Sequence, residues 1–146
     1  YDNAILNGVL LGMKKKYIKE KINEIFEFAE VQDFIDTPLK FYSSGMLMRL
    51  AFSIGVFANG DIYIFDEILA VGDANFQKKC FDSFKNLIEK GKTIILITHD
   101  LETVSKYATR VLLLNGKNHK IVNDINIIKQ MGKSSFDDIY RSEGLI

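Results

Sequence analysis

The first half of the chain repeats apolar residues at intervals of three and four, which is the spacing of one face of an α-helix. This spacing predicts helices over residues 4–12 and 17–30. The second helix is amphipathic, with apolar positions at Ile18, Ile22, Ile25, Phe26 and Ala29. Pro38, the only proline, cannot continue a helix and ends this part of the chain.

A third helix is predicted to begin at Ser43 or Ser44, because either hydroxyl can cap a helix N-terminus. Asn59-Gly60 is a typical helix end. The expected apolar face consists of Leu47, Leu50, Ala51, Ile54 and Phe57.

Two apolar runs then predict strands, over residues 62–65 and 93–98. The first is almost uninterrupted, as expected of a parallel strand that is buried on both faces. A helix between them can be capped by Asp73 or Asn75 and is ended by Gly91. Its apolar stripe is Phe76, Cys80, Phe84, Leu87 and Ile88. A strand–helix–strand succession predicts an α/β fold with a mostly parallel sheet and a right-handed crossover.

The last part of the chain is predicted to contain a hairpin of antiparallel strands. After a short helix ending at Ala108, residues 110–114 and 117–122 form strands of a hairpin around Asn115-Gly116. Residues 124–131 are compatible with a last short helix, and residues 132–146 are interpreted as a tail or linker without an assigned function.

Composition narrows the class of protein. Apolar residues make up 47% of the chain, which is typical of a globular protein. Lys+Arg and Asp+Glu both number 19, so no basic excess favours nucleic acid. The single cysteine, Cys80, excludes an intramolecular disulfide and lies on an apolar helix face, where packing is favoured over reactivity. No apolar run approaches the ~18 residues of a membrane span.

Polar residues follow both predicted parallel strands. Asp66 and Glu67 come after the first strand and His99 after the second. Ligands bind at the carboxyl edge of such sheets. Asp66 can hold Mg²⁺ through a water molecule, and Glu67 can accept a proton from an attacking water. Taken alone, an Asp-Glu pair is more often a helix cap, and a histidine after a strand is more often a core residue.

The run Tyr42-Ser43-Ser44-Gly45-Met46 leads into the third helix. Ser43 offers a hydroxyl, and Gly45 lets the backbone approach a phosphate closely. The positive end of the helix points at the same place. A plain helix cap is the alternative interpretation.

In this order and spacing, these motifs resemble the second half of an ATP-binding-cassette (ABC) ATPase. Residues 42–46 resemble the signature loop and residues 62–67 the Walker B strand with its catalytic glutamate. Asp73 is similar to the D-loop aspartate and His99 to the switch histidine. Ser44 and Met46 replace the commoner glycine and glutamine, as in the branch that exports bacterial surface polysaccharides and teichoic acids.

The resemblance implies a fold and a set of roles. Residues 1–123 would be a partial P-loop NTPase domain of the ABC type, with a helical subdomain and signature helix over about 1–58 and a catalytic core over about 59–123. Residues 124–146 would be a C-terminal helix and tail. The implied ligands are ATP and Mg²⁺. Glu67 and His99 would be catalytic, Asp66 would hold Mg²⁺, and the nucleotide contacts would be Tyr42, Ser43, Ser44, Gly45, Met46 and Asp73.

The same resemblance implies an assembly. Two copies of the subunit would form a homodimer on an integral-membrane permease, at the cytoplasmic face of the membrane, without nucleic acid. The alternatives are a soluble ABC-type ATPase of translation or DNA repair, and a truncated, non-enzymatic dimerisation or scaffold module.

No G-x-x-x-x-G-K-[ST] phosphate loop occurs in the sequence. Gly91-Lys92-Thr93 precedes a strand, whereas a phosphate loop follows one and opens a helix. The chain also begins with Tyr1 rather than with methionine. We therefore expect a fragment whose N-terminal half, with the phosphate loop, lies upstream, and which is inactive alone.

Overall fold

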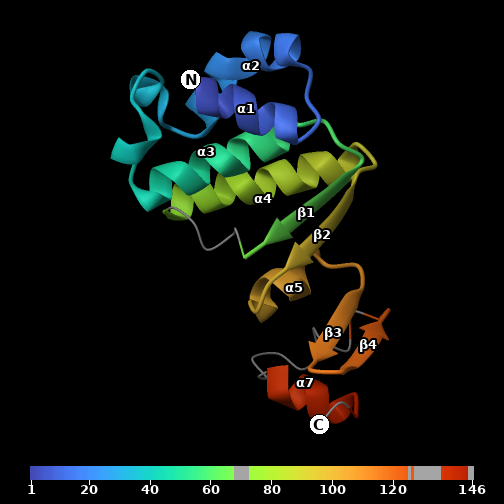
Figure 1. The fold of residues 1–146 in the computed structure, drawn as a ribbon. Helices are drawn as coiled ribbons and strands as arrows, with labels where there is room; N and C mark the ends of the chain where they lie inside the picture. The colour runs from blue at the N-terminus through green and yellow to red at the C-terminus, as the bar shows by residue number, and fades with distance from the viewer. Residues whose placement is uncertain (68–72, 125, 127–135, 145–146) are drawn as a thin grey trace. The chain divides into compact units, whose positions relative to one another are not determined.

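The computed structural model describes residues 1–67, 73–124, 126 and 136–144 and divides the chain into two compact units, Tyr1–Ile97 and Thr98–Ile146. The first contains, in chain order, α1 (Asp2–Leu10), α2 (Lys15–Phe28), α3 (Ser44–Phe57), β1 (Ile62–Asp66), α4 (Ala74–Glu89) and β2 (Thr93–Ile97). Figure 1 shows α3 and α4 side by side, with α1 and α2 on the far side of α3 from α4.

The two predicted N-terminal helices are confirmed as α1 and α2. The predicted apolar positions of α2 are buried, with Ile18 and Ile25 wholly excluded from solvent. They pack with α1 and α3 into a first core cluster. Two short 3₁₀ turns, η1 (Gln32–Phe34) and η2 (Leu39–Phe41), connect α2 to α3 and were not predicted.

The predicted apolar face of α3 is only partly right. Leu50 and Ile54 are buried as expected, but Ala51 is exposed and Phe52 is buried instead. The reason is that α3 lies between two clusters of the core. Leu50 and Ile54 join the cluster with α1 and α2, whereas Phe52 belongs to a second cluster with β1 and α4.

The parallel pairing of β1 and β2 confirms the α/β class. Ile62 lies opposite Thr93 and Asp66 opposite Ile97, and α4 connects the two strands. Gly91 ends the connection with a φ of 74°, a conformation that glycine adopts without strain. The predicted stripe of α4 is confirmed except at Ile88, which is 48% exposed.

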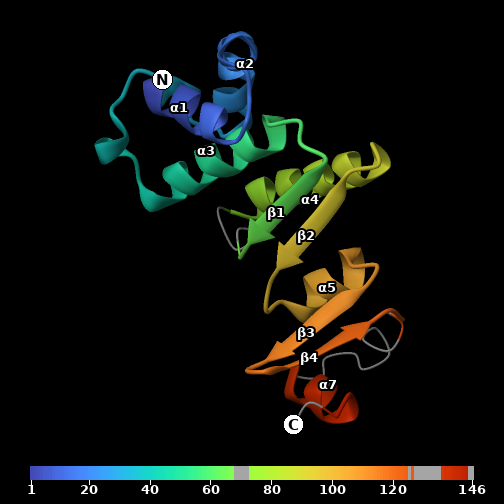
Figure 2. The same ribbon diagram turned by 45° about the vertical axis from the view of Figure 1, so that its right-hand side comes forward.

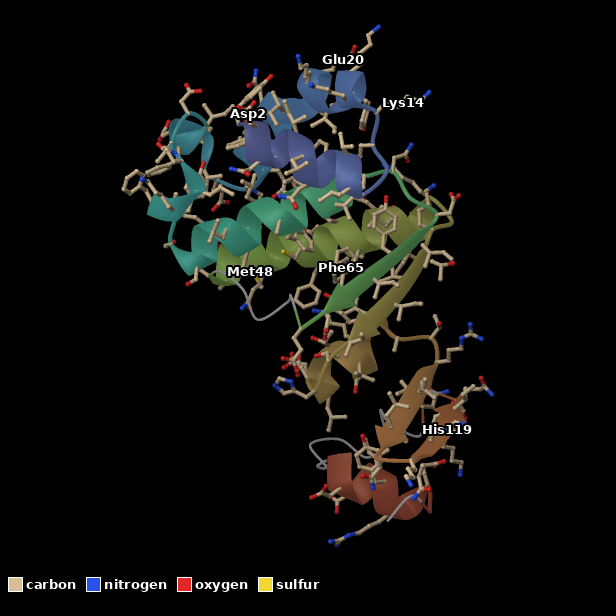
Figure 3. All side chains as sticks on the ribbon, viewed as in Figure 1. Asp2, Lys14, Glu20, Met48, Phe65 and His119 are labelled. Carbon is tan, nitrogen blue, oxygen red and sulfur yellow. The ribbon has the colours of Figure 1, made fainter. Side chains whose placement is uncertain are left out.

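The prediction that β1 is buried on both faces is wrong in this structure. Tyr63 and Phe65 are buried, but Ile62 and Ile64 are 63% and 67% exposed. Side chains alternate between the faces of a strand, and the described helices cover only one face. On that face, Phe65 points from β1 toward the helices (Figure 3) and contacts the rings of Phe52 and Phe84.

The second unit consists of α5 (Leu101–Tyr107), the strands β3 (Val111–Asn115) and β4 (Asn118–Val122), and α7 (Phe136–Ser142) (Figure 2). The predicted hairpin is confirmed, with β3 antiparallel to β4 and Gly116 at a φ of 58° in its turn. The core of this unit contains Val104, Leu113, Val122 and Ile139.

The predicted helix over 124–131 lies almost wholly outside the described residues. α7 falls in the stretch interpreted as a tail, and Ile139 is 1% exposed. This burial ties α7 to the hairpin, so part of the stretch is a packed element. Among the helices that the structure describes, none has the length and apolar character needed to cross a bilayer.

Candidate nucleotide-binding site

The turn formed by residues 43–46, called here the 43–46 turn, opens α3. Ser43 has extended backbone angles, and its Oγ accepts a hydrogen bond from the Met46 amide at 3.2 Å. Ser43, rather than Ser44, is therefore the helix cap. Among the residues that the structure describes, a Cβ added at Gly45 would have only Ser43 Oγ near it, at 3.8 Å, so these residues leave the backbone at the start of α3 open to a ligand.

The side chain of Tyr42 faces the first core cluster. It is 8% exposed, its hydroxyl donates a hydrogen bond to the Phe34 carbonyl, and its ring meets that of Phe34 edge-on. Burial raises the pKa of the Tyr42 hydroxyl. The side chain thus anchors the 43–46 turn to the core.

An open pocket of about 360 Å³ lies at this turn. It is lined by Glu30, Val31, Ser43, Gly45, Met46, Arg49 and Asp73. Tertiary folding therefore brings three predicted residues of the turn to one place with Asp73, a predicted residue from the start of α4. The side chains of Tyr42 and Ser44 do not line this pocket.

Asp73 uses its two carboxylate oxygens for different purposes. Oδ1 accepts hydrogen bonds from the amides of Asn75 and Phe76, both at 3.0 Å, and so caps α4. Oδ2 accepts one from Arg49 at 3.1 Å. The amide of Phe76 and then the guanidinium of Arg49 hold the pKa of Asp73 below its ordinary value of 3.8. Asp73 is therefore ionised at neutral pH.

Asp66 and Glu67 lie at the carboxyl end of β1, and both are exposed. The Glu67 amide donates to the Ile97 carbonyl at 3.0 Å, which continues the β1–β2 ladder by one residue. The φ of Glu67 is 47°, in the left-handed region that non-glycine residues seldom adopt. Such backbone costs roughly 1–3 kcal/mol and is concentrated at functional sites. The chain therefore turns sharply at the residue predicted to be the catalytic base.

His99 belongs to the second unit, where it precedes the N-cap of α5. The Asp100 carboxylate accepts hydrogen bonds from the amides of Glu102 and Thr103 and from the Thr103 hydroxyl. The Asp100 amide donates to Thr98 Oγ1 at 3.0 Å. The Thr103 hydroxyl, then these amides and nearby His99, lower the pKa of Asp100. His99 thus lies in a segment whose backbone is held on both sides.

Several known proteins are similar to this chain in sequence. The chain is 43% identical over 115 residues to the O-antigen export system ATP-binding protein RfbB of Myxococcus xanthus, a match covering 79% of this chain and 26% of that protein. It is 44% identical over 127 residues to the teichoic acids export ATP-binding protein TagH of Bacillus anthracis, covering 87% and 23%. The RfbB protein of Klebsiella pneumoniae is 40% identical over 120 residues, covering 82% and 48%. The chain belongs to the ABC ATPase family and matches part of an ATP-binding subunit.

The matched segment makes up less than half of each of these relatives. No family model matches the chain. A solved ATP-binding subunit of an ABC transporter superposes with a TM-score of 0.74 at 18% identity, covering 95% of this chain and 61% of that one. The ADP conformation of an ATP-binding cassette of an ABC transporter gives 0.60 at 19% identity, covering 87% and 57%. At this identity the structural matches support the ABC ATPase fold.

The ABC family implies a magnesium ion, and the Asp66 carboxylate is the side chain predicted to hold it. Within the described part of the chain, no three His, Cys, Asp or Glu side chains converge on a metal site. Asp66, exposed at the carboxyl end of β1, would offer the ion one carboxylate. Mg²⁺ is commonly held by one or two carboxylates, with its other positions filled by water and phosphate oxygens.

Arg49 and Glu30 also line the pocket beside the 43–46 turn, and neither was predicted from the sequence. One signal was available, because Arg49 follows Met46 by one turn of α3 and so shares its face. The partners of Arg49 lie 19 and 24 residues away in the chain, and no local pattern indicates them. Glu30 lies just after the C-terminal end of α2, where the helix dipole disfavours negative charge. Its contact with Arg49 gives a reason for an acidic residue at this position.

Proposed function

We propose that this chain is part of an ATP-hydrolysing subunit of an ABC transporter that exports a cell-surface polysaccharide or a teichoic acid. The observation that carries the proposal is the common pocket of the 43–46 turn and Asp73. The export-system names of relatives that are 40–44% identical support export over a soluble ABC ATPase.

The 43–46 turn would bind phosphate oxygens of ATP. The amides at the start of α3 point toward the N-terminal end of the helix, where the helix dipole favours negative charge. Gly45 leaves that backbone uncovered. By the family resemblance, the turn would serve the nucleotide held by the opposing subunit, with Asp73 at the same interface.

Glu67 would act as the general base. Its carboxylate would take a proton from the attacking water while the water oxygen bonds to the γ-phosphorus. The bond from that phosphorus to the bridging oxygen then breaks, which yields ADP and phosphate. A positioned base contributes about 10²–10⁴-fold to a rate. His99 would donate a hydrogen bond to the γ-phosphate and orient the water.

Asp66 would hold Mg²⁺ through a water molecule. When bound, the ion would neutralise charge on the phosphate oxygens. Asp66 pairs in register with Ile97 at the end of β2, so the parallel ladder fixes its backbone.

The assembly that follows is a homodimer bound to an integral-membrane permease, peripheral to the cytoplasmic face of the membrane. The equal numbers of basic and acidic residues give no reason to expect nucleic acid as a further partner. We propose that residues 1–123 belong to the ATPase domain, with about 1–58 as helical subdomain and signature helix, about 59–123 as catalytic core, and 124–146 as a C-terminal extension.

The test is Glu67→Gln in the complete ATPase subunit that contains this chain. Glutamine keeps the shape of the side chain but cannot accept the proton, so turnover should fall by about 10²-fold or more while ATP binding persists. Phosphate release measures the turnover, and a fluorescent ATP analogue measures binding. Glu89→Gln, at an exposed position near the end of α4, is the matched control.

In cells, the Glu67→Gln subunit should fail to restore the surface glycan to a strain that lacks the gene, whereas the Glu89→Gln subunit should restore it. ATPase activity of Glu67→Gln within a few-fold of wild type would show that Glu67 is not the base. Normal surface glycans in the deletion strain would contradict export.

A further inference from the structure

Arg49 of α3 links two other elements of the first unit. Its Nη1 donates to Glu30 Oε2 at 2.6 Å, just after α2, and its Nη2 donates to Asp73 Oδ2 at 3.1 Å, at the start of α4. The side chain is 18% exposed, and its guanidinium lies over the Phe76 ring, 4.9 Å from the centroid. One residue of α3 therefore holds the end of α2 and the cap of α4.

The network continues through Lys79 of α4. Glu30 Oε1 accepts a hydrogen bond from Lys79 Nζ at 3.0 Å, and Lys79 also donates to the Phe28 carbonyl at 2.9 Å. Glu30 has a φ of 58°, so the chain bends sharply where its carboxylate meets both cations. The contacts with Lys79 restrict the position of the Glu30 carboxylate. The hydrogen bond from Arg49 to Glu30 in turn restricts the position of the Arg49 guanidinium.

The charges around the pocket make Arg49 important for an anion. Among the described residues that line the pocket, Glu30 and Asp73 are acidic and Arg49 is the one cation. A phosphate near Ser43 and Gly45 would meet both carboxylates. Without Arg49 their repulsion would oppose the attraction of the α3 N-terminus.

We propose that Arg49 is a positioning residue for ATP hydrolysis, one that holds Asp73 beside the 43–46 turn so that both meet the partner subunit's nucleotide together. This inference rests on the function proposed above. The planar guanidinium reaches two carboxylates with separate N–H groups. Lysine, a point charge on a flexible stem, cannot reproduce that bridge.

The decisive variant is Arg49→Lys in the complete ATPase subunit. The charge stays but the bridge is lost, so kcat should fall about 10- to 100-fold, the range expected for a displacement of ~1 Å at a reacting site. KM for ATP should change less than about threefold, because the turn acts only when two subunits close. The melting temperature should stay close to that of wild type, because partly exposed ion pairs contribute little stability. Arg110→Lys, at an exposed position of the second unit, is the matched control.

Two further measurements separate positioning from a general structural effect. Asp73→Asn keeps a good helix cap but weakens the hydrogen bond to Arg49. If both residues act through this bond, the double variant with Arg49→Lys should have a kcat no lower than that of the worse single variant. A mixture of Arg49→Lys with Glu67→Gln subunits should recover activity, because one composite site of the mixed dimer carries neither change. A merely unstable variant would not recover.

The outcomes distinguish the two proposals. If Arg49→Lys keeps kcat within twofold of wild type, or if its effect adds fully to that of Asp73→Asn, the inference about Arg49 fails and the ATPase function stands. If Arg49→Lys does not fold, Asp73→Asn with normal kcat overturns the inference. If the wild-type subunit does not hydrolyse ATP, the proposed function itself fails.

Discussion

Phe52 of α3 is the centre of the second core cluster, and its removal should destabilise the first unit strongly. The residue is 2% exposed. Its ring centroid lies 5.5 Å from that of Phe65 on β1 and 5.9 and 6.1 Å from those of Phe84 and Phe76 on α4. The ring of Phe28 on α2 lies 6.3 Å away. Phe52→Ala would therefore leave a cavity between all these elements.

The magnitude follows from this packing. Truncating a buried phenylalanine to alanine costs about 3–5 kcal/mol, a range that already includes the lost ring contacts. Because the rings around Phe52 come from three elements that cannot all move into the space, we expect at least the middle of this range, about 4 kcal/mol. Small domains have only about 5–15 kcal/mol of stability. The first unit would then be only marginally stable.

Urea unfolding of the 146-residue chain, followed by far-UV circular dichroism, measures this change. With a typical slope of about 1.5–2 kcal/mol per molar urea, the midpoint should fall by about 2–3 M. Phe52→Leu should fall less, since it keeps much of the volume. Phe41→Ala, at a position that is 68% exposed, should change the free energy of unfolding by less than about 0.5 kcal/mol. A loss below about 1.5 kcal/mol for Phe52→Ala would refute tight packing around this ring.

Three other predictions concern the site and its surroundings. Mixing subunits with Gly45→Asp and with Glu67→Gln should restore part of the ATPase activity, and no recovery would contradict a signature loop that acts across the dimer. Folding lowers the pKa of Asp73 and Asp100. The stability that these carboxylates contribute is therefore complete above the ordinary carboxyl pKa and is lost as pH falls through the folded pKa values. The urea midpoint of wild type should exceed that of Asp73→Ala at neutral pH, and this difference should shrink below about pH 4. Burial raises the pKa of the Cys80 thiol to about 12, so iodoacetamide should label it at about pH 8 only in urea, and labelling of the native chain would show that the second cluster opens.

Much of the fold could be predicted because its signals are local. The helical spacing of Ile18, Ile22 and Ile25 depends only on 3.6 residues per turn, and the structure buries all of them. Cap and turn residues act through their own neighbours, so Gly91 and the Asn115-Gly116 turn end or reverse the chain where expected. The candidate residues Ser43, Gly45 and Glu67 could be named from sequence because each belongs to a short motif, and their roles stay predictions.

Other features depend on which elements meet, and only the tertiary structure decided these. The sequence of α3 indicates an amphipathic helix but not that Phe52 faces a second cluster, because that depends on where β1 and α4 pack. The apolar run of β1 is compatible with burial on both faces, whereas the described helices cover one. Arg49 had one weak local signal, and its bridge to Glu30 and Asp73 had none. A hydrogen bond between residues far apart in the chain depends on how helices pack, and helix packing is set by the summed burial of many side chains.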